Sequence, residues 1–317
     1  MTSAMFRNLK NDPAGNLPPL SLCRRFRGGS TLNSQFAKFL FFLSFVALFA
    51  FQATAQNTLP PPPPPPAVPS APPAPAPGPT LTSKQLENLV SRIALYPDPL
   101  LAQILTASTF WNEIPEAALW ANEHNSLRGD ALADAIRADN LQWDPSVLAL
   151  LPFPSVLNMM AQDPTWTEQL GNAVLSQRTE IMDAVQRLRK QARKYGYLRT
   201  NPYCTVIESG PYVEILPVNP AYIYVPIYDP LVVFAPPRPG FVITGAIGWN
   251  PAVVITVGFF PWGWAHPYFA WGAHAIIFDE TPWNRHWLNR GYYVHPYAHP
   301  WVPRVGPRME MHSAPRR

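Results

Sequence analysis

The chain has 317 residues, of which 47% are hydrophobic and 14% are charged, and its formal net charge is +4. Residues 1–55 contain six Lys or Arg residues and one acid, so the remaining chain is nearly neutral with a net charge of −1. This balance excludes a nucleic-acid-binding protein, which needs a basic surface.

Residues 1–55 have the organisation of an export signal. A basic segment ends at Lys38, an uncharged apolar run follows at 39–51, and the small residues Ala53 and Ala55 flank a candidate cleavage site. This pattern predicts a cleavable signal peptide and a location in the periplasm or cell envelope. An uncleaved anchor is the alternative, although the apolar run is shorter than the roughly 20 residues that span a bilayer.

Residues 56–80 form a proline-rich linker. Seven consecutive prolines occupy 60–66, and most other residues up to Pro79 are Pro or Ala. Such sequences favour the extended polyproline helix, so we expect a stiff spacer. Recognition of the prolines by a partner is the alternative use.

Residues 81–235 are expected to form one domain that begins with helices. Apolar residues recur at helical spacing, and Asp-Pro pairs at Asp98, Asp144 and Asp163 precede apolar segments, so we interpret these aspartates as helix caps. The basic residues at 187–194 are expected to lie on a solvated helix face. The predicted helices cover residues 82–95, 98–110, 114–124, 130–139, 145–151, 154–162, 164–176 and 179–195.

After Gly196 the apolar period changes from 3.6 to 2. Segments rich in Val, Ile and Tyr at 204–209, 212–216, 221–227 and 231–235 are separated by Gly, Pro and Asn turns. They predict a small antiparallel sheet, and the fold class is therefore α+β. Cys204, the one cysteine after the signal, is expected to be a half-buried thiol in a strand, with a disulfide-linked dimer or a reactive thiol as alternatives.

Several segments in this region together resemble one bacterial family of exported proteins, the domain of unknown function DUF3300. They are LYPDPLLAQIL (95–105), WDPSV (143–147), LPFP (151–154), MDAVQRLR (182–189) and NPAYIYVPIYDP (219–230). The resemblance implies an envelope location and suggests membrane association. It implies no catalytic residue, because the family has no established activity.

Residues 236–317 are expected to form a separate low-complexity tail rich in aromatic, Gly, His and Pro residues. Its uncharged run at 241–260 has the length of a membrane span, but Gly245, Gly248 and Pro251 interrupt it. Buried or sheet-forming segments are therefore favoured, and membrane contact is the alternative.

The tail contains two sets of candidate binding residues. Neutral histidines bind transition metals, so the weak metal candidates are His286, His295, His299 and His312. Indole and guanidinium groups bind glycans, lipid headgroups or proteins, or else pack a core. The candidate surface comprises Trp262, Trp264, Trp271, Trp283, Arg285, Trp287 and Trp301.

The sequence contains none of the common catalytic motifs, including Gly-x-Ser-x-Gly, His-Glu-x-x-His, the phosphate loop and the dinucleotide fingerprint. We therefore expect no catalytic activity and no cofactor. The expected function is that of an interaction or structural protein that contacts the envelope membrane, a glycan or an envelope protein. The alternatives are a periplasmic hydrolase with carboxylates assembled by the fold and a transition-metal-binding module that uses the tail histidines.

Overall fold

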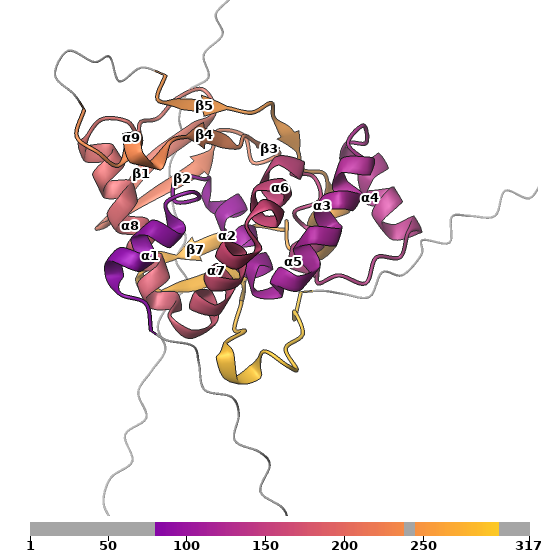
Figure 1. Ribbon diagram of the computed structural model, residues 1–317. Helices are drawn as coiled ribbons and strands as arrows, with labels where there is room; N and C mark the ends of the chain where they lie inside the picture. The colour runs from indigo at the N-terminus through magenta and orange to yellow at the C-terminus, as the bar shows by residue number, and fades with distance from the viewer. Residues whose placement is uncertain (1–79, 238–244, 298–317) are drawn as a thin grey trace, which may run out of the picture. The chain divides into compact units, whose positions relative to one another are not determined.

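The computed structural model describes residues 80–237 and 245–297, all of which belong to one compact unit. The predicted signal peptide and almost all of the predicted linker lie outside these ranges, as do His299, Trp301 and His312. Within the described ranges, helices come first and small antiparallel sheets follow (Figure 1), so the predicted α+β class is confirmed.

The helical part follows the predicted order closely. The 3₁₀ helix η1 (Ser108–Glu113) continues directly from α2, and α1 is shorter than predicted because turns replace its last five residues. The α-helices are α1 (Ser83–Val90), α2 (Asp98–Ala107), α3 (Ile114–Glu123), α4 (Gly129–Ala138), α5 (Pro145–Leu148), α6 (Pro154–Gln162), α7 (Pro164–Ser176) and α8 (Arg178–Lys194).

Local side-chain chemistry explains where several helices begin. Thr82 and Gln85 form a capping box at α1. Asp144 accepts from the backbone N–H of Ser146 at α5, and Asp163 accepts from that of Trp166 at α7. Asp98 does not cap α2: it is the first residue of the helix and its side chain is buried, which corrects the prediction for this position.

Helix α2 lies at the centre of the helical part and is buried along nearly its whole length. It packs against α5, α7 and strands β2 (Tyr212–Pro217) and β7 (Tyr268–Ala270), and Figure 1 shows β7, in yellow, beside α2. Around this centre, α1 packs on α8, α3 packs on α6, and α7 packs on η1.

In the described part of the chain, four small antiparallel sheets replace the one sheet that the sequence predicts. Strand β1 (Cys204–Ser209) forms a hairpin with β2 through a turn in which Gly210 has a φ of +57°. Strands β3 (Tyr222–Ile223) and β4 (Pro226–Tyr228) pair with later strands, β6 (Val253–Val254) and β5 (Ile247–Trp249). The last sheet contains β7, β8 (Ala275–Phe278) and β9 (Thr281–Pro282).

The predicted strand at 231–235 is wrong. The structure has a short helix there, α9 (Pro230–Val233), and Asp229 accepts a hydrogen bond from the backbone N–H of Leu231 at its start. The Asp-Pro pair that marks α5 and α7 thus also begins α9, and this local capping outweighs the strand propensity of the apolar residues that follow.

The residues after 235 do not form a separate tail in the described part of the chain. Strands β5 and β6 complete the sheets begun by β4 and β3, and Phe259, Phe269 and Ile276 belong to the same hydrophobic core as the helices. The uncharged run 241–260 is broken, as expected: its described part contains β5, β6 and the start of the 3₁₀ helix η2 (Val257–Trp262). Among the described helices, none has both the length and the apolar character to cross a bilayer.

Candidate functional site

A buried ion pair joins the helical part to the sheets. Asp98 at the start of α2 and Arg189 on α8 approach to 2.6 Å, and almost no part of either side chain is exposed. Arg189 was predicted to lie on a solvated basic face, and its burial in the structure corrects this prediction. Arg189 lies on the same face of α8 as Met182, Val185 and Ala192, which are all apolar. This helical spacing indicates that Arg189 is buried.

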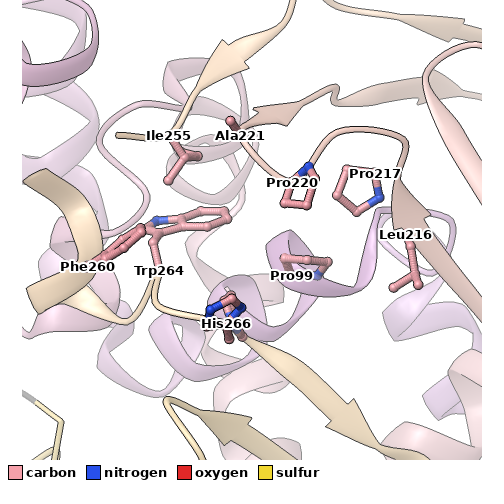
Figure 2. A pocket seen from close by; sticks show the side chains of 10 residues that line it. Pro99, Leu216, Pro217, Pro220, Ala221, Ile255, Phe260, Trp264 and His266 are labelled. Atoms are coloured by element: carbon pink, nitrogen blue, oxygen red, sulfur yellow. The ribbon is translucent and has the colours of Figure 1, made fainter. Parts of the chain in front are cut away.

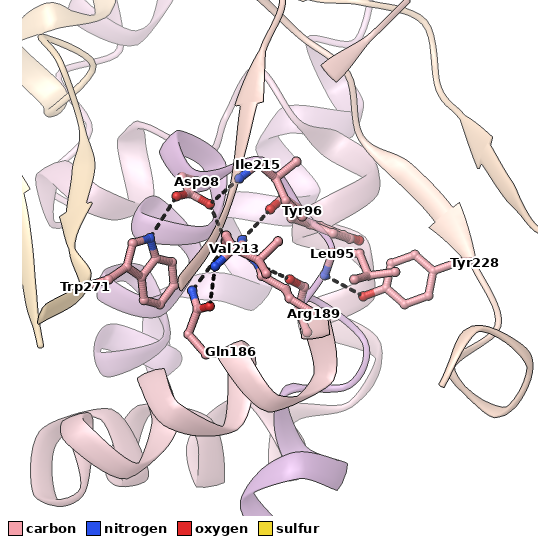
Figure 3. A network of polar contacts seen from close by, with 10 residues as sticks. Leu95, Tyr96, Asp98, Gln186, Arg189, Val213, Ile215, Tyr228 and Trp271 are labelled. Carbon is pink, nitrogen blue, oxygen red and sulfur yellow. Dashed lines mark hydrogen bonds and ion pairs between the residues drawn. The ribbon is translucent and has the colours of Figure 1, made fainter. Parts of the chain in front are cut away.

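Hydrogen bonds satisfy both partners of this ion pair (Figure 3). Arg189 donates to the carbonyl oxygens of Ala94, Tyr96 and Val213 at 2.8, 2.9 and 3.0 Å. Asp98 accepts from Trp271 Nε1 at 3.1 Å and from the backbone N–H of Ile215 at 3.3 Å. Burial raises the pKa of Asp98, while Arg189 and Trp271 oppose this shift. We interpret the network as a structural junction because no part of it is open to a substrate.

An apolar pocket lies beside this junction. Pro99 follows Asp98 in α2 and Leu216 follows Ile215 in β2, so the ion pair positions two of the residues that line the pocket. Figure 2 shows Pro217 and Pro220 on one side and Phe260 and Trp264 on the other. The cavity has a volume of about 390 Å³, which is in the range of small ligand sites.

The pocket walls are almost entirely apolar. Trp264 is buried, its Nε1 donates to the carbonyl oxygen of Ala149 at 2.9 Å, and its ring stacks on Phe153. Four prolines and the side chains of Ile255 and Ala221 complete much of the remaining wall. His266 is the one ionisable residue in the lining, and it is exposed. Such a lining binds apolar groups and offers little for acid–base chemistry.

Exposed apolar side chains adjoin the pocket in sequence. Val218 lies between the lining residues Pro217 and Pro220, and its exposed fraction is 57%. Tyr222 and Val254 are also exposed and are paired across β3 and β6. Three lining residues of the pocket therefore have an exposed apolar neighbour in sequence.

A second polar cluster fastens the C-terminal described segment to the helices. His295 Nε2 lies 2.9 Å from Asp144 Oδ1, and Glu113 accepts from the backbone N–H of Asp144 at 2.6 Å. Arg285 donates to the carbonyl oxygen and the hydroxyl of Thr109 at 2.9 and 2.8 Å. Burial raises the pKa of Glu113, and the charge of Asp144 raises it further. The side chain of His295 is fully buried, so we assign this cluster a structural role.

The candidate metal residues do not form a metal site within the described ranges. His295 contacts Asp144, and His286 lies at the start of the 3₁₀ helix η4 (Trp287–Asn289). Among the described residues, no group of three or more His, Cys, Asp or Glu side chains has an arrangement that would hold a metal ion. His299 and His312 lie outside those ranges.

The candidate aromatic surface is mostly interior. The exposed fractions of Trp264, Trp271 and Trp283 are 5%, 4% and 2%, and that of Arg285 is 7%. Trp262 and Trp287 are half-buried, and the guanidinium groups of Arg137 and Arg290 lie over their rings. These indoles therefore pack the core, which was the alternative interpretation, and the buried ones are not available as an exposed binding face.

Cys204 is more completely buried than expected. Its exposed fraction is 1%, it lies in β1, and burial raises the pKa of its thiol to about 11. The thiol is therefore protonated at neutral pH, and it has neither the exposure nor the ionisation of a reactive cysteine.

The lining of the apolar pocket was not predicted from the sequence. Pro99 was interpreted only as part of a helix start, and Leu216 and Pro220 only as parts of a strand and a turn. No local pattern brings these residues together, because the pocket forms where α2, β2, β3 and η2 meet. Trp264 was predicted as a binding residue, and it does line the pocket, although its indole N–H is occupied by the protein.

Comparison with known proteins identifies the family. The model of the family described as protein of unknown function (DUF3300) matches residues 82–299, which extend past the domain boundary predicted at 235. The chain is also similar to Uncharacterized protein YacH of Escherichia coli (strain K12), with 33% identity over an alignment of 185 positions; the match covers 48% of this chain and 30% of that protein. The matched part thus spans less than a third of the relative's length. No solved structure matches the chain. Since the family model covers well over half of it, the chain belongs to the DUF3300 family.

Proposed function

We propose that this protein is a noncatalytic binding protein of the cell envelope and that its apolar pocket receives a large apolar side chain of a protein partner. The observation that carries the proposal is the pocket itself: a cavity of about 390 Å³ with apolar walls, three of whose lining residues (Pro217, Ala221 and Ile255) are next in sequence to the exposed apolar residues Val218, Tyr222 and Val254. Pockets that take one buried side chain, surrounded by apolar contacts that exclude water, contribute much of the binding energy of protein interfaces.

The shape and chemistry of the pocket favour a protein over the other partners considered. A glycan needs polar groups beside an exposed aromatic face, whereas the ring of Trp264 is buried and His266 is the one ionisable group in the lining. A membrane surface could contact the exposed apolar residues, but such contact would not require a pocket. The support for an envelope location is the pattern of basic and apolar segments at 1–55, which predicts a signal peptide.

Photo-crosslinking tests this proposal. We expect a photoreactive residue in place of His266, at the pocket mouth, to form a defined covalent product with one envelope protein in intact cells. The second variant, Ala221→Phe, fills the pocket from its wall and should reduce that product at least fivefold because the partner side chain can no longer enter. Thermal unfolding of Ala221→Phe should match that of the wild type, which shows that the loss is not caused by unfolding.

The matched control places the photoreactive residue at Leu119, an exposed apolar position on α3 away from the pocket lining. It should not give the same product. Crosslinks to lipid alone would contradict a protein partner and would favour membrane contact. A protein product that persists unchanged in Ala221→Phe would contradict the pocket as the binding site.

A further inference from the structure

A second hollow lies at the other end of β2 and has the opposite character. It is a groove of about 550 Å³ between the C-terminal turns of α8 and the β1–β2 hairpin. Its lining includes Lys190, Arg193, Lys194, Glu208, Gly210 and Tyr212. Three cationic side chains therefore face one carboxylate across the groove.

Two of these cations are not neutralised. Arg193 forms an ion pair with Glu208. Lys190 and Lys194 have no acidic partner within ion-pair distance in the part of the chain that the structure describes, whereas Lys84, Arg92, Arg137 and Arg187 each have one. The positive charge is local, because residues 80–235 contain 11 basic and 16 acidic residues. The region as a whole is negatively charged, so it would not attract polyanions in general, and this cluster of positive charge lies in the groove.

The position of the lysines on α8 adds a second argument. Cations in the last turn of a helix are stabilised by its dipole, which explains Arg193 and Lys194. Lys190 lies one turn earlier, where that effect has fallen off. Lys190 and Lys194 are four residues apart, a spacing at which like charges on a helix repel each other. An anion bound between them would offset this repulsion.

The hairpin leaves the groove accessible. Gly210 forms the tight turn with a φ of +57°, and a methyl group in place of its hydrogen would meet no atom within 4 Å. Lys190, Arg193 and Lys194 are all exposed, so their charged groups can reach a ligand without rearrangement of the core.

We propose that this groove binds a phosphate group. A phosphate carries up to two negative charges for the two unpaired lysines, and the planar guanidinium group of Arg193 can donate to two of its oxygens. Glu208 then competes with the ligand for Arg193. The same chemistry occurs in the headgroup of an anionic phospholipid and in a soluble phosphate compound. This site is separate from the apolar pocket and does not depend on the function proposed for it.

Titration with inorganic pyrophosphate, followed by calorimetry and by amide NMR shifts, tests the site on the chain without its signal segment. We expect saturable binding with shifts at residues 190–194 and 208–212. The double variant Lys190→Gln/Lys194→Gln should weaken binding at least tenfold. Glu208→Gln should strengthen it at least twofold, because it removes the competing carboxylate; a groove with only a structural role would show no such gain.

The matched control, Lys84→Gln/Arg128→Gln, removes the same charge from exposed positions outside the groove lining. It should change binding less than twofold. Flotation with vesicles of phosphatidylglycerol, and of phosphatidylcholine as the neutral comparison, distinguishes the two sources. Binding to phosphatidylglycerol vesicles that the Lys190→Gln/Lys194→Gln variant abolishes assigns a lipid headgroup, whereas pyrophosphate binding alone assigns a soluble phosphate. Absence of binding to both probes, or equal loss in the control, would overturn the proposal.

Discussion

Arg189 connects segments that lie far apart in the chain. Its guanidinium group donates to Asp98 and to the carbonyl oxygens of Ala94, Tyr96 and Val213. One side chain of α8 thus connects the segment that precedes α2, the first residue of α2, and strand β2. Trp271 joins the same network through Asp98. A buried charge is tolerated only when it is paired and hydrogen-bonded, and here both conditions hold.

Removing one partner of this pair should therefore destabilise the protein strongly. We expect Asp98→Asn to lower the free energy of unfolding by about 3–5 kcal/mol, because it leaves the Arg189 charge buried without a counter-charge. Chemical denaturation followed by circular dichroism measures this change. The double variant Asp98→Asn/Arg189→Met should recover part of the loss. If Asp98→Asn changed stability by less than about 1 kcal/mol, the pair would not have the role that we assign to it.

At the scale of elements, the close approach of α7 and η1 depends on a residue without a side chain. Gly171 of α7 faces η1, and a Cβ atom there would lie 2.0 Å from the backbone oxygen of Ser108. Because the neighbouring atom belongs to the backbone, it cannot rotate away. The spacing between α7 and η1 is therefore set by this glycine.

Gly171→Ala should destabilise the protein, although glycine is normally the poorer residue in a helix. Propensity alone predicts a gain of about 1 kcal/mol, whereas the overlap with Ser108 should cost more than that and give a net loss of about 1–3 kcal/mol. The melting temperature and denaturation midpoint measure the sign directly. Asn172→Ala, the next position on α7, is the control and should change stability far less. A stabilised Gly171→Ala protein would show that α7 and η1 separate readily.

The positions of the helices were largely predictable, since apolar spacing and Asp-Pro pairs are local signals. The prediction for α7 matches the structure, and α9 was missed because the same Asp-Pro signal was not applied at Asp229. The strand pairing was not predictable: β3 and β4 pair with β6 and β5, which follow at a distance in sequence, and strands of two or three residues carry little periodic pattern.

At the scale of the whole molecule, the segment 245–297 is part of the main core. Trp264, Phe269 and Trp283 are buried against the helices, Arg285 donates to Thr109, and His295 Nε2 lies 2.9 Å from Asp144 Oδ1. The hydrophobic burial of several large side chains contributes on the order of 2 kcal/mol each. Summed over these side chains, the contribution is comparable to the total stability of a typical domain.

A chain that ends at residue 237 should therefore fail to fold cooperatively. We expect it to bind hydrophobic dyes and to lose the sharp thermal transition of the full chain, because α2 and α7 would expose the surface that this segment covers. Differential scanning calorimetry and near-ultraviolet circular dichroism measure both effects. A chain that ends at residue 299, where the family match ends, is the control and should retain the transition. Cooperative unfolding of the shorter chain would show that residues 81–235 are an independent domain.

The sequence by itself determined the α+β class, the order of the helices, the expectation of export and the family resemblance, because each depends on local spacing or on short contiguous motifs. Only the tertiary structure decided which charges and indoles are buried, where the apolar pocket and the basic groove lie, and that residues 245–297 complete the core. The physical reason is that these properties arise from contacts between segments far apart in the chain. Asp98 and Trp271, for example, are separated by 173 residues, and no local sequence pattern predicts such a contact.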